Sequence, residues 1–234
     1  MNPILVALDV STAAEALKIA DELRGVVGGF KIGSQLFTSA GGSIVSRLVE
    51  NGDRVFLDLK FHDIPNTVAG AVKAGTEMGV WMLNVHASGG AAMMQAARRA
   101  ADECGVPRPL VIAVTVLTSL DAATLASVGV DASPLEQVIR LARLAQDSGL
   151  DGVVASPLET SAIRAACGAD FLIVTPGIRA DAAAGSDDQK RTMTAAAAIA
   201  AGSSYLVVGR PITGAIDRRA AAEAMAADVS LTSR

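Results

Sequence analysis

Hydrophobic positions divide this chain into short apolar, β-branched runs that alternate with alanine-rich stretches of helical periodicity. The apolar runs predict strands, and the stretches between them predict helices. The strand candidates are residues 4–9, 30–33, 54–60, 82–86, 110–115, 152–155, 171–175 and 205–209. The helix candidates include residues 13–24, 67–78, 91–103, 135–148, 191–201 and 214–227.

The order of these segments predicts the fold. Eight strand-then-helix units follow one another with no linker and no break in composition, which indicates a parallel sheet covered by helices. The count of eight favours a closed (β/α)8 TIM barrel, one α/β domain over residues 1–234, over an open doubly wound sheet. No G-x-G-x-x-G motif follows the first strand, which weakens the dinucleotide-binding alternative.

The third strand candidate carries the densest group of ionisable side chains. Asp58 and Lys60 follow the apolar run 55–57, and Asp63 lies three residues further on. Because side chains alternate along a strand, Asp58 and Lys60 should point to the same side of the sheet. Pro65 fits the first turn of a helix, so the strand should end near Lys60 and a helix should follow. The group is either a structural ion pair at the barrel mouth or a set of side chains that act on a ligand.

Polar residues also end most of the other strand candidates. In a (β/α)8 barrel the active site lies at the carboxyl ends of the strands, so these residues are the candidates for function. For any single residue a structural role is as good an explanation, but two lysines and two aspartates together resemble a mutually tuned charge array. The polar strand-end residues are Asp9, Lys31, Asp58, Lys60, Asn84, His86, Thr115, Thr118, Ser119, Thr175, Arg179 and Arg210.

The end of the last strand candidate resembles a phosphate-binding site, which such barrels often build from the loops after strands seven and eight. Gly209 would let a backbone N–H approach an anion, Arg210 offers a fork of donors, and the following helix adds its dipole. The structural alternative is that Arg210 caps a loop. The connection at about 176–190 is long for a barrel loop, and Arg179 and Gln189 could close it over a substrate as a lid.

Composition and charge narrow the possible functions. Hydrophobic residues make up 51% of the chain and aromatic residues 3%, so the core is built from Ala, Val, Leu and Ile, with Trp81 and Tyr205 interpreted as core residues. The net charge of −4 argues against nucleic acid or an anionic membrane as partner. The longest uncharged run, 192–209, contains a Gly-Ser-Ser break and is a poor membrane span.

Cysteine usage and the first residues indicate the compartment. Cys104 and Cys167 stand without any ligand spacing, which is typical of buried free thiols in a reducing environment. The apolar run 4–8 has no basic region before it and does not resemble a signal peptide. We therefore expect a cytoplasmic protein.

The candidate residues fall within a set of short motifs. The central one, D-x-K-x-x-D-I-P-x-T over residues 58–67, is moderately specific by itself, because related phosphosugar barrels share D-x-K-x-x-D. The other motifs span nearly the whole chain, at residues 7–9, 30–33, 114–119, 175–179 and 208–212. With this set the chain resembles the orotidine 5′-monophosphate decarboxylase family of bacterial type, whose enzymes carry out the last step of UMP synthesis.

The resemblance implies how the central residues act. Lys31, Asp58, Lys60 and Asp63 would form an alternating lysine–aspartate array at the catalytic centre. Asp63 and Thr67 would enter the site of a neighbouring subunit, so the enzyme would be a homodimer with two shared sites. The family uses no metal and no organic cofactor.

The resemblance also implies the substrate contacts. Asp9 and Lys31 would hold the ribose hydroxyls of orotidine 5′-monophosphate, and Thr118 and Ser119 would lie beside the pyrimidine. The partners would be this substrate and the product UMP, with no nucleic acid and no membrane. The phosphate would be bound by Gln189, Gly209 and Arg210, with Arg179 joining them from the lid.

The residue types suit the chemistry that the resemblance implies. Loss of CO2 from C6 of the pyrimidine leaves a carbanion in the ring plane, where no π system can absorb the charge. Without a cofactor as electron sink, its stabilisation must be electrostatic. Lys60 would offer positive charge and then donate the proton that gives UMP. Asp58 would lie near the departing carboxylate and favour the charged form of Lys60.

Three alternatives stay open at this point. One is a sister barrel enzyme, a Mg²⁺-dependent 3-keto-gulonate 6-phosphate decarboxylase or a hexulose phosphate synthase, since these share the central motif. Another is a barrel without catalysis that binds a nucleotide or a phosphosugar as a sensor. The third is a metal site at His62 with Asp58 and Asp63, although His62 is better explained as the neighbour of a charged turn. His86 is interpreted as a packed or hydrogen-bonded residue on the rim.

Overall fold

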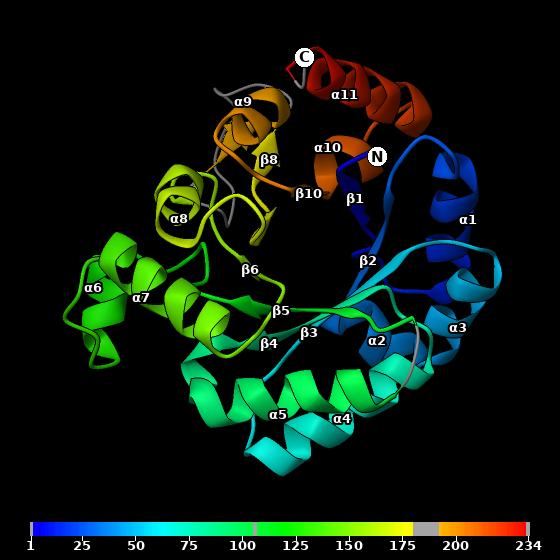
Figure 1. Ribbon diagram of the computed structural model, residues 1–234. Helices are drawn as coiled ribbons and strands as arrows, with labels where there is room; N and C mark the ends of the chain where they lie inside the picture. Colours follow the sequence, from blue (N-terminus) through cyan, green and yellow to red (C-terminus); the bar gives the residue numbers. More distant parts are fainter. Residues whose placement is uncertain (1, 105–106, 180–191, 233–234) are drawn as a thin grey trace.

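Eight parallel strands close into a barrel in the computed structural model, which describes residues 2–104, 107–179 and 192–232 (Figure 1). The order around the barrel is β1, β10, β7, β6, β5, β4, β3, β2, so the last strand pairs with the first. The TIM-barrel fold expected from the sequence is confirmed. The barrel strands are β1 (Ile4–Ala7), β2 (Gly29–Gly33), β3 (Val55–Phe61), β4 (Met82–His86), β5 (Leu110–Val114), β6 (Gly152–Val154), β7 (Leu172–Thr175) and β10 (Tyr205–Val208).

Helices surround the strands on the outside of the barrel (Figure 1). Capping residues fix several helix starts: the Thr12 side chain accepts the backbone N–H of Glu15, and Ser133 forms a capping box with Glu136. The helices are α1 (Ala13–Leu23), α2 (Ser34–Ala40), α3 (Ser43–Glu50), α4 (Pro65–Glu77), the 3-10 turn η1 (Ala87–Gly89), α5 (Gly90–Glu103), α6 (Ala122–Ser127), α7 (Pro134–Asp147), α8 (Thr160–Cys167), α9 (Ala195–Ala200), α10 (Arg210–Thr213) and α11 (Arg218–Thr232).

Element boundaries differ from the sequence expectation in the last third of the chain. α9 begins later than the expected 191, because the Thr194 side chain accepts the N–H of Ala197 and so caps the helix. The expected helix 214–227 is replaced by α10 and α11, and Asp217 accepts the N–H of Ala220 at the start of α11. Strand β3 agrees with the expectation to within one residue, and α4 begins at Pro65, two residues before the expected 67–78 and with the proline in its first turn.

The core has two layers, one between sheet and helices and one inside the barrel. Alternation along the strands divides the side chains, so Leu57 faces the helices and Phe56 the barrel interior. Trp81 and Tyr205 are half-buried against the inner layer, edge to face with ring centroids 5.1 Å apart. They pack as core residues should, but neither is fully buried. The inner layer consists of Leu5, Phe56, Met82, Ile112 and Val174.

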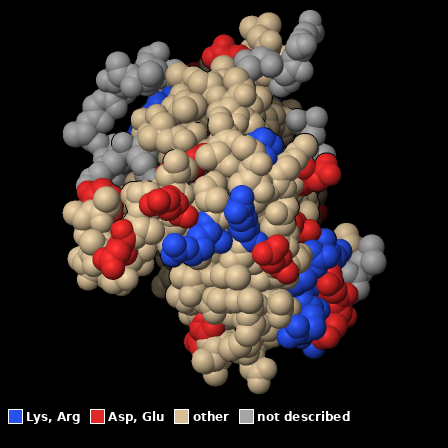
Figure 2. Space-filling view, turned by 60° about the vertical axis from the view of Figure 1, so that its left-hand side comes forward, with Lys and Arg blue, Asp and Glu red and all other residues tan. Residues whose placement is uncertain are grey.

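The surface carries charges of both signs. Figure 2 shows Lys and Arg interspersed with Asp and Glu over a mostly uncharged face, without a broad patch of one sign on that face. Across the described ranges, no helix combines the length and apolarity that a membrane span requires. Both cysteines are free, but Cys104 is half-buried rather than buried as expected, whereas burial raises the pKa of the Cys167 thiol.

Candidate active site

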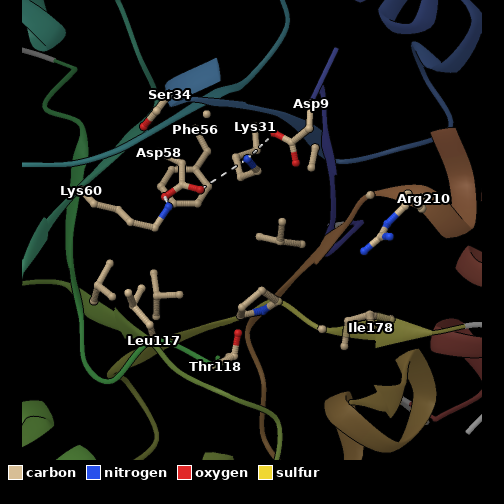
Figure 3. Close-up of a pocket in the computed structure, with 18 of the residues that line it drawn as sticks. Asp9, Lys31, Ser34, Phe56, Asp58, Lys60, Leu117, Thr118, Ile178 and Arg210 are labelled. Atoms are coloured by element: carbon tan, nitrogen blue, oxygen red, sulfur yellow. Dashed lines mark hydrogen bonds and ion pairs between the residues drawn. The ribbon is translucent and has the colours of Figure 1, made fainter. Parts of the chain in front are cut away.

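The carboxyl ends of the barrel strands open into a cavity of about 680 Å³ (Figure 3). Its walls come from β1, β2, β3, β5, β6, β7, β10 and the loops that follow them, so the cavity joins segments from the whole chain. This volume lies within the roughly 300–1,000 Å³ that small-molecule sites occupy. The sequence candidates that line it are Asp9, Lys31, Asp58, Lys60, Thr118, Arg179, Gly209 and Arg210.

Two lysines and two aspartates form a continuous chain of ion pairs on one wall (Figure 3). Lys31 Nζ lies 3.0 Å from Asp9 Oδ1 and 3.4 Å from Asp58 Oδ2, and Lys60 Nζ lies 2.7 Å from Asp58 Oδ1. Lys31 and Asp58 are 6% and 9% exposed, so their charges depend on one another for compensation. The expectation that Asp58 and Lys60 point to the same side is confirmed.

Gly33 makes room for the Lys31–Asp9 pair. A Cβ atom at this position would lie 2.9 Å from Lys31 Nζ and 3.1 Å from Asp9 Oδ1, too close for either group to stay in place. The sequence analysis included Gly33 in a motif but gave it no role. Its signal was a glycine at the carboxyl end of a buried strand, which marks close approach of another group.

The backbone of β3 departs from a regular strand where the array lies. Lys60 has φ of 53°, the sole positive value at a non-glycine residue in the part of the chain that the structure describes. The pairing of β3 with β4 shifts between Leu57 and Phe61, which is a bulge. A left-handed residue with a side chain costs roughly 1–2 kcal/mol, and such strain is typical of functional sites.

Asn84 of β4 is a further residue at the site, a polar strand end to which the sequence alone gives no specific role. Its side chain is fully buried, donates from Nδ2 to Asp58 Oδ1 at 2.7 Å and accepts the backbone N–H of Lys60 at 2.8 Å. A polar side chain within an apolar strand was the available signal, because buried amides need partners.

The opposite side of the cavity has the features of an anion site. Arg210 lies across the cavity from Lys60 (Figure 3) and is the first residue of α10, with Gly209 at the N-cap. A Cβ atom at Gly209 would meet Ala7 Cβ at an ordinary 3.8 Å, so protein packing does not require a glycine there. The helix N-terminus, the guanidinium group and the unblocked backbone together suit a phosphate group.

The ends of the loop expected to act as a lid lie side by side. Ile178 and Arg179 form β8 (Ile178–Arg179), which pairs in parallel with β9 (Met193–Thr194). Ile178 and Arg179 also line the cavity. Gln189 and residues 180–191 as a whole lie outside the described residues.

Three of the residues to which the resemblance gives a role do not lie in the cavity of their own chain. Asp63, Thr67 and Ser119 are exposed and are absent from its walls. Asp63 Oδ1 accepts the N–H of Ile64 at 2.6 Å, which fixes the turn before α4. Asp63 therefore does not complete the array within one chain.

A histidine pair lies on the rim beside the array. The rings of His62 and His86 have centroids 5.3 Å apart, and the pKa of His86 is lowered by burial and by the neighbouring charges of His62 and Lys60. This agrees with the interpretation of His86 as a packed rim residue. Across the described ranges, no group of three or more His, Cys, Asp or Glu side chains is arranged to hold a metal ion, so the alternative of a metal site at His62 gains no support.

The fold and the site together define an enzyme-type barrel, in which a charge array and a helix end with the features of an anion site face one cavity. The sequence matches the model of the "Orotidine 5'-phosphate decarboxylase / HUMPS family" over residues 2–225. The chain belongs to this family, as the resemblance indicated.

Named relatives match over nearly the full chain. An orotidine 5′-phosphate decarboxylase of Chromobacterium violaceum is 55% identical, covering 98% of this chain and 92% of that protein. One of Moorella thermoacetica is also 55% identical, covering 98% and 93%. The crystal structure of orotidine 5′-phosphate decarboxylase from Lactobacillus acidophilus is similar with a TM-score of 0.87 at 38% identity, covering 98% of this chain and 99% of that one.

Proposed function

We propose that this protein decarboxylates orotidine 5′-monophosphate to UMP, the last step of de novo pyrimidine nucleotide synthesis, without a metal or an organic cofactor. The observation that carries the proposal is the Lys31–Asp58–Lys60 group on one wall of a cavity whose opposite wall carries Arg210 and the α10 N-terminus. Membership of the family and the 55% identity to named decarboxylases support the same reaction.

The substrate spans the cavity between these two walls. Its phosphate is held by Gly209 and Arg210, and its ribose hydroxyls by Asp9 and Lys31. The pyrimidine then lies toward Lys60, beside Thr118. Half-buried Thr118 lines the cavity, which supports its role, whereas exposed Ser119 requires a shift of its loop to take part.

The chemical step breaks the bond between C6 and the carboxylate carbon. CO2 leaves without the bonding electron pair, which remains on C6 as a carbanion in the ring plane. The Lys60 ammonium group stabilises this charge and then transfers one proton from Nζ to C6, which gives UMP. Asp58, which accepts from Lys60 Nζ at 2.7 Å, orients the ammonium group and lies beside the departing carboxylate.

The first experiment is an ultraviolet assay of the purified protein with orotidine 5′-monophosphate in excess EDTA. Rapid loss of substrate absorbance would support both the reaction and its independence of metal ions. The family name also covers HUMPS enzymes, so a phosphosugar should be assayed with and without Mg²⁺. Turnover of the phosphosugar with Mg²⁺, and none of orotidine 5′-monophosphate, would contradict the proposal. Binding of UMP without any turnover would indicate a sensor.

We further propose a homodimer in which Asp63 and Thr67 complete the site of the partner subunit. Both residues are exposed in the single chain, and the apolar side chain of Ile64 between them is 67% exposed. An apolar residue beside a charged one at the mouth of the barrel suits an interface that is covered on association.

Subunit complementation tests the shared site. Asp63→Asn and Lys60→Ala homodimers should each be nearly inactive. After the two variants are mixed and allowed to exchange, each mixed dimer has one intact site, so about a quarter of the wild-type activity should return. No recovery, with mixed dimers shown by mass spectrometry, would contradict a shared site.

We also propose that the chain is one barrel domain that carries its own lid at about 176–190 and works in the cytoplasm. The pairing of β8 with β9 supports the lid, because it holds both ends of the loop beside the cavity. Arg179 and Gln189 would contact the phosphate when the lid closes. Protection of this loop from trypsin by UMP, compared with uridine as a control without phosphate, would test the closure.

A further inference from the structure

Asn84 occupies the place where the hydrogen-bond ladder between β3 and β4 is interrupted. The register pairs Leu57 with Leu83 and then Phe61 with Val85, so β3 has two more residues than β4 in this interval. Within it, the N–H of Lys60 bonds to the Asn84 side chain instead of to the backbone of β4. One amide group therefore replaces the missing part of the ladder.

Both hydrogen bonds of this amide go to the array. Nδ2 donates to Asp58 Oδ1, the oxygen that also accepts from Lys60 Nζ, and Oδ1 accepts the Lys60 N–H. Asn84 thus holds Lys60 at its backbone and, through Asp58, at its ammonium group. Because Asn84 is fully buried and does not line the cavity, it cannot contact a ligand directly.

The left-handed conformation of Lys60 explains why such a contact is needed. A side-chain-bearing residue leaves φ of 53° unless its surroundings hold it there. In that conformation the Lys60 N–H bonds to the side-chain carbonyl group of Asn84. The backbone of β4 provides no acceptor for it, because the strand pairing shifts at this point. The direction in which Lys60 leaves the backbone, and so the position of Nζ, depends on this bond.

We propose that Asn84 is a positioning residue for the decarboxylation, which fixes the proton donor Lys60 and its partner Asp58 in their reactive arrangement. The proposal rests on the proposed function, since it assigns Asn84 a role in that reaction. An uncharged amide suits the position, because it donates to a carboxylate and accepts from an N–H in the same orientation. A carboxylate there would repel Asp58. An apolar side chain would remove the acceptor of the Lys60 N–H and one of the donors to Asp58.

The test compares Asn84→Leu with a matched control, Asn2→Leu. Leucine keeps the number and branching of the side-chain heavy atoms of asparagine, although its methyl groups are bulkier, and removes both hydrogen bonds. Asn2 also donates to a carbonyl, that of Val26, and accepts a backbone N–H, that of Ile4, but it lies before β1 at the other end of the barrel. In Asn84→Leu, kcat should fall about 100-fold while KM changes less than about threefold, because a displaced donor slows chemistry more than binding. In Asn2→Leu, kcat should stay at the wild-type value.

The variant Asn84→Asp provides a second measurement, the pH dependence of its activity relative to wild type. If Asn84 had only a structural role, this ratio would not depend on pH. The introduced carboxyl group keeps the acceptor for Lys60 but faces Asp58, and the two carboxyl groups can share a proton. Activity relative to wild type should therefore rise as the pH is lowered from about 8 to about 6, because the protonated form can donate to Asp58 again. Protonation of His86 and of the substrate phosphate occurs in both proteins, so the activity ratio reports mainly the introduced carboxyl group.

The outcomes separate this inference from the proposed function. A wild-type protein without activity on orotidine 5′-monophosphate would overturn the function and the inference with it. An active wild type, with Asn84→Leu folded and kcat within threefold of wild type, would overturn the inference alone. If Asn84→Leu does not fold, an Asn84→Asp activity ratio that is independent of pH would overturn it in the same way.

Discussion

The two ends of the barrel use charged side chains in opposite ways. At the carboxyl end, the charges of Lys31, Asp58 and Lys60 are compensated mainly by one another, and they face a cavity. At the amino end, charged groups bond to the backbone of the strands and loops. Arg164 donates to the carbonyl groups of Gly168, Ala169, Phe171 and Gly202.

A second cluster repeats this pattern before β5 and β6. Asp151 accepts from the N–H of Val111 at 2.8 Å and from both terminal nitrogens of Arg108, each also at 2.8 Å. The pKa of Arg108 is raised, mainly because its guanidinium group donates hydrogen bonds to the Asp151 carboxylate. Charged side chains therefore stabilise the fold at the amino end. At the carboxyl end, the backbone holds Lys60 in a strained conformation, and the charge array is already formed without a ligand.

The largest expected effect comes from removing a charge at the carboxyl end. Lys60→Ala should lower kcat/KM at least about 10⁴-fold, because the proton donor and the positive charge are lost together. The variant should remain folded by circular dichroism. Lys18→Ala, on an exposed position of α1, is the matched control and should keep full activity. Near-normal turnover in Lys60→Ala would remove the basis for the proposed mechanism.

The opposite effect is expected at the amino end. Arg164→Ala should lower the free energy of unfolding by about 2–3 kcal/mol, since four carbonyl groups lose a charged donor. Urea unfolding measures this loss, and kcat at a temperature where the variant is folded should not change. Exposed Arg143→Ala should shift stability by less than about 0.5 kcal/mol. A loss of kcat without a loss of stability in Arg164→Ala would contradict the division between the two ends.

The strain at Lys60 can be measured with a pair of variants. Lys60→Gly should be more stable than Lys60→Ala by up to about 1 kcal/mol, because glycine adopts positive φ without a steric penalty. The same pair at Lys18, within helix α1, should show the opposite order by about 1 kcal/mol. If glycine is the less stable residue at both positions, the conformation of Lys60 is not strained.

The smallest effect concerns the pH dependence of stability at the rim. The pKa of His86 lies below its ordinary value of 6.5, chiefly because of burial, so the unfolded chain takes up this proton first as the pH falls. This residue should therefore destabilise the protein increasingly below about pH 6.5 and have little effect at pH 8. As the pH is lowered, the urea midpoint of wild type should fall relative to that of His86→Gln. The difference between them should shrink, or the variant should become the more stable protein. A variant that loses relative stability on acidification would contradict this sign.

The sequence predicts the barrel and most of its cavity because both follow from local rules. Apolar runs give the strands, and the carboxyl-end rule then brings residues such as Asp9, Lys31 and Arg210 to one place. The bulge at Lys60 and the role of Asn84 could not be predicted, because they depend on the register between β3 and β4. Asp63 marks a further limit, since its proposed role comes from the family resemblance and no pattern within one chain predicts a contact with a second subunit.

The packing of Trp81 against Tyr205 has a practical consequence. They are the only tryptophan and the only tyrosine in the sequence, and they touch at the amino end of the barrel, away from the cavity. The tryptophan and tyrosine fluorescence of this protein therefore comes from these two neighbouring rings at the amino end of the barrel. This emission should follow the opening of the barrel during unfolding, whereas neither ring lines the cavity at the mouth. We therefore expect the fluorescence change on unfolding to be distinct from any optical change on ligand binding.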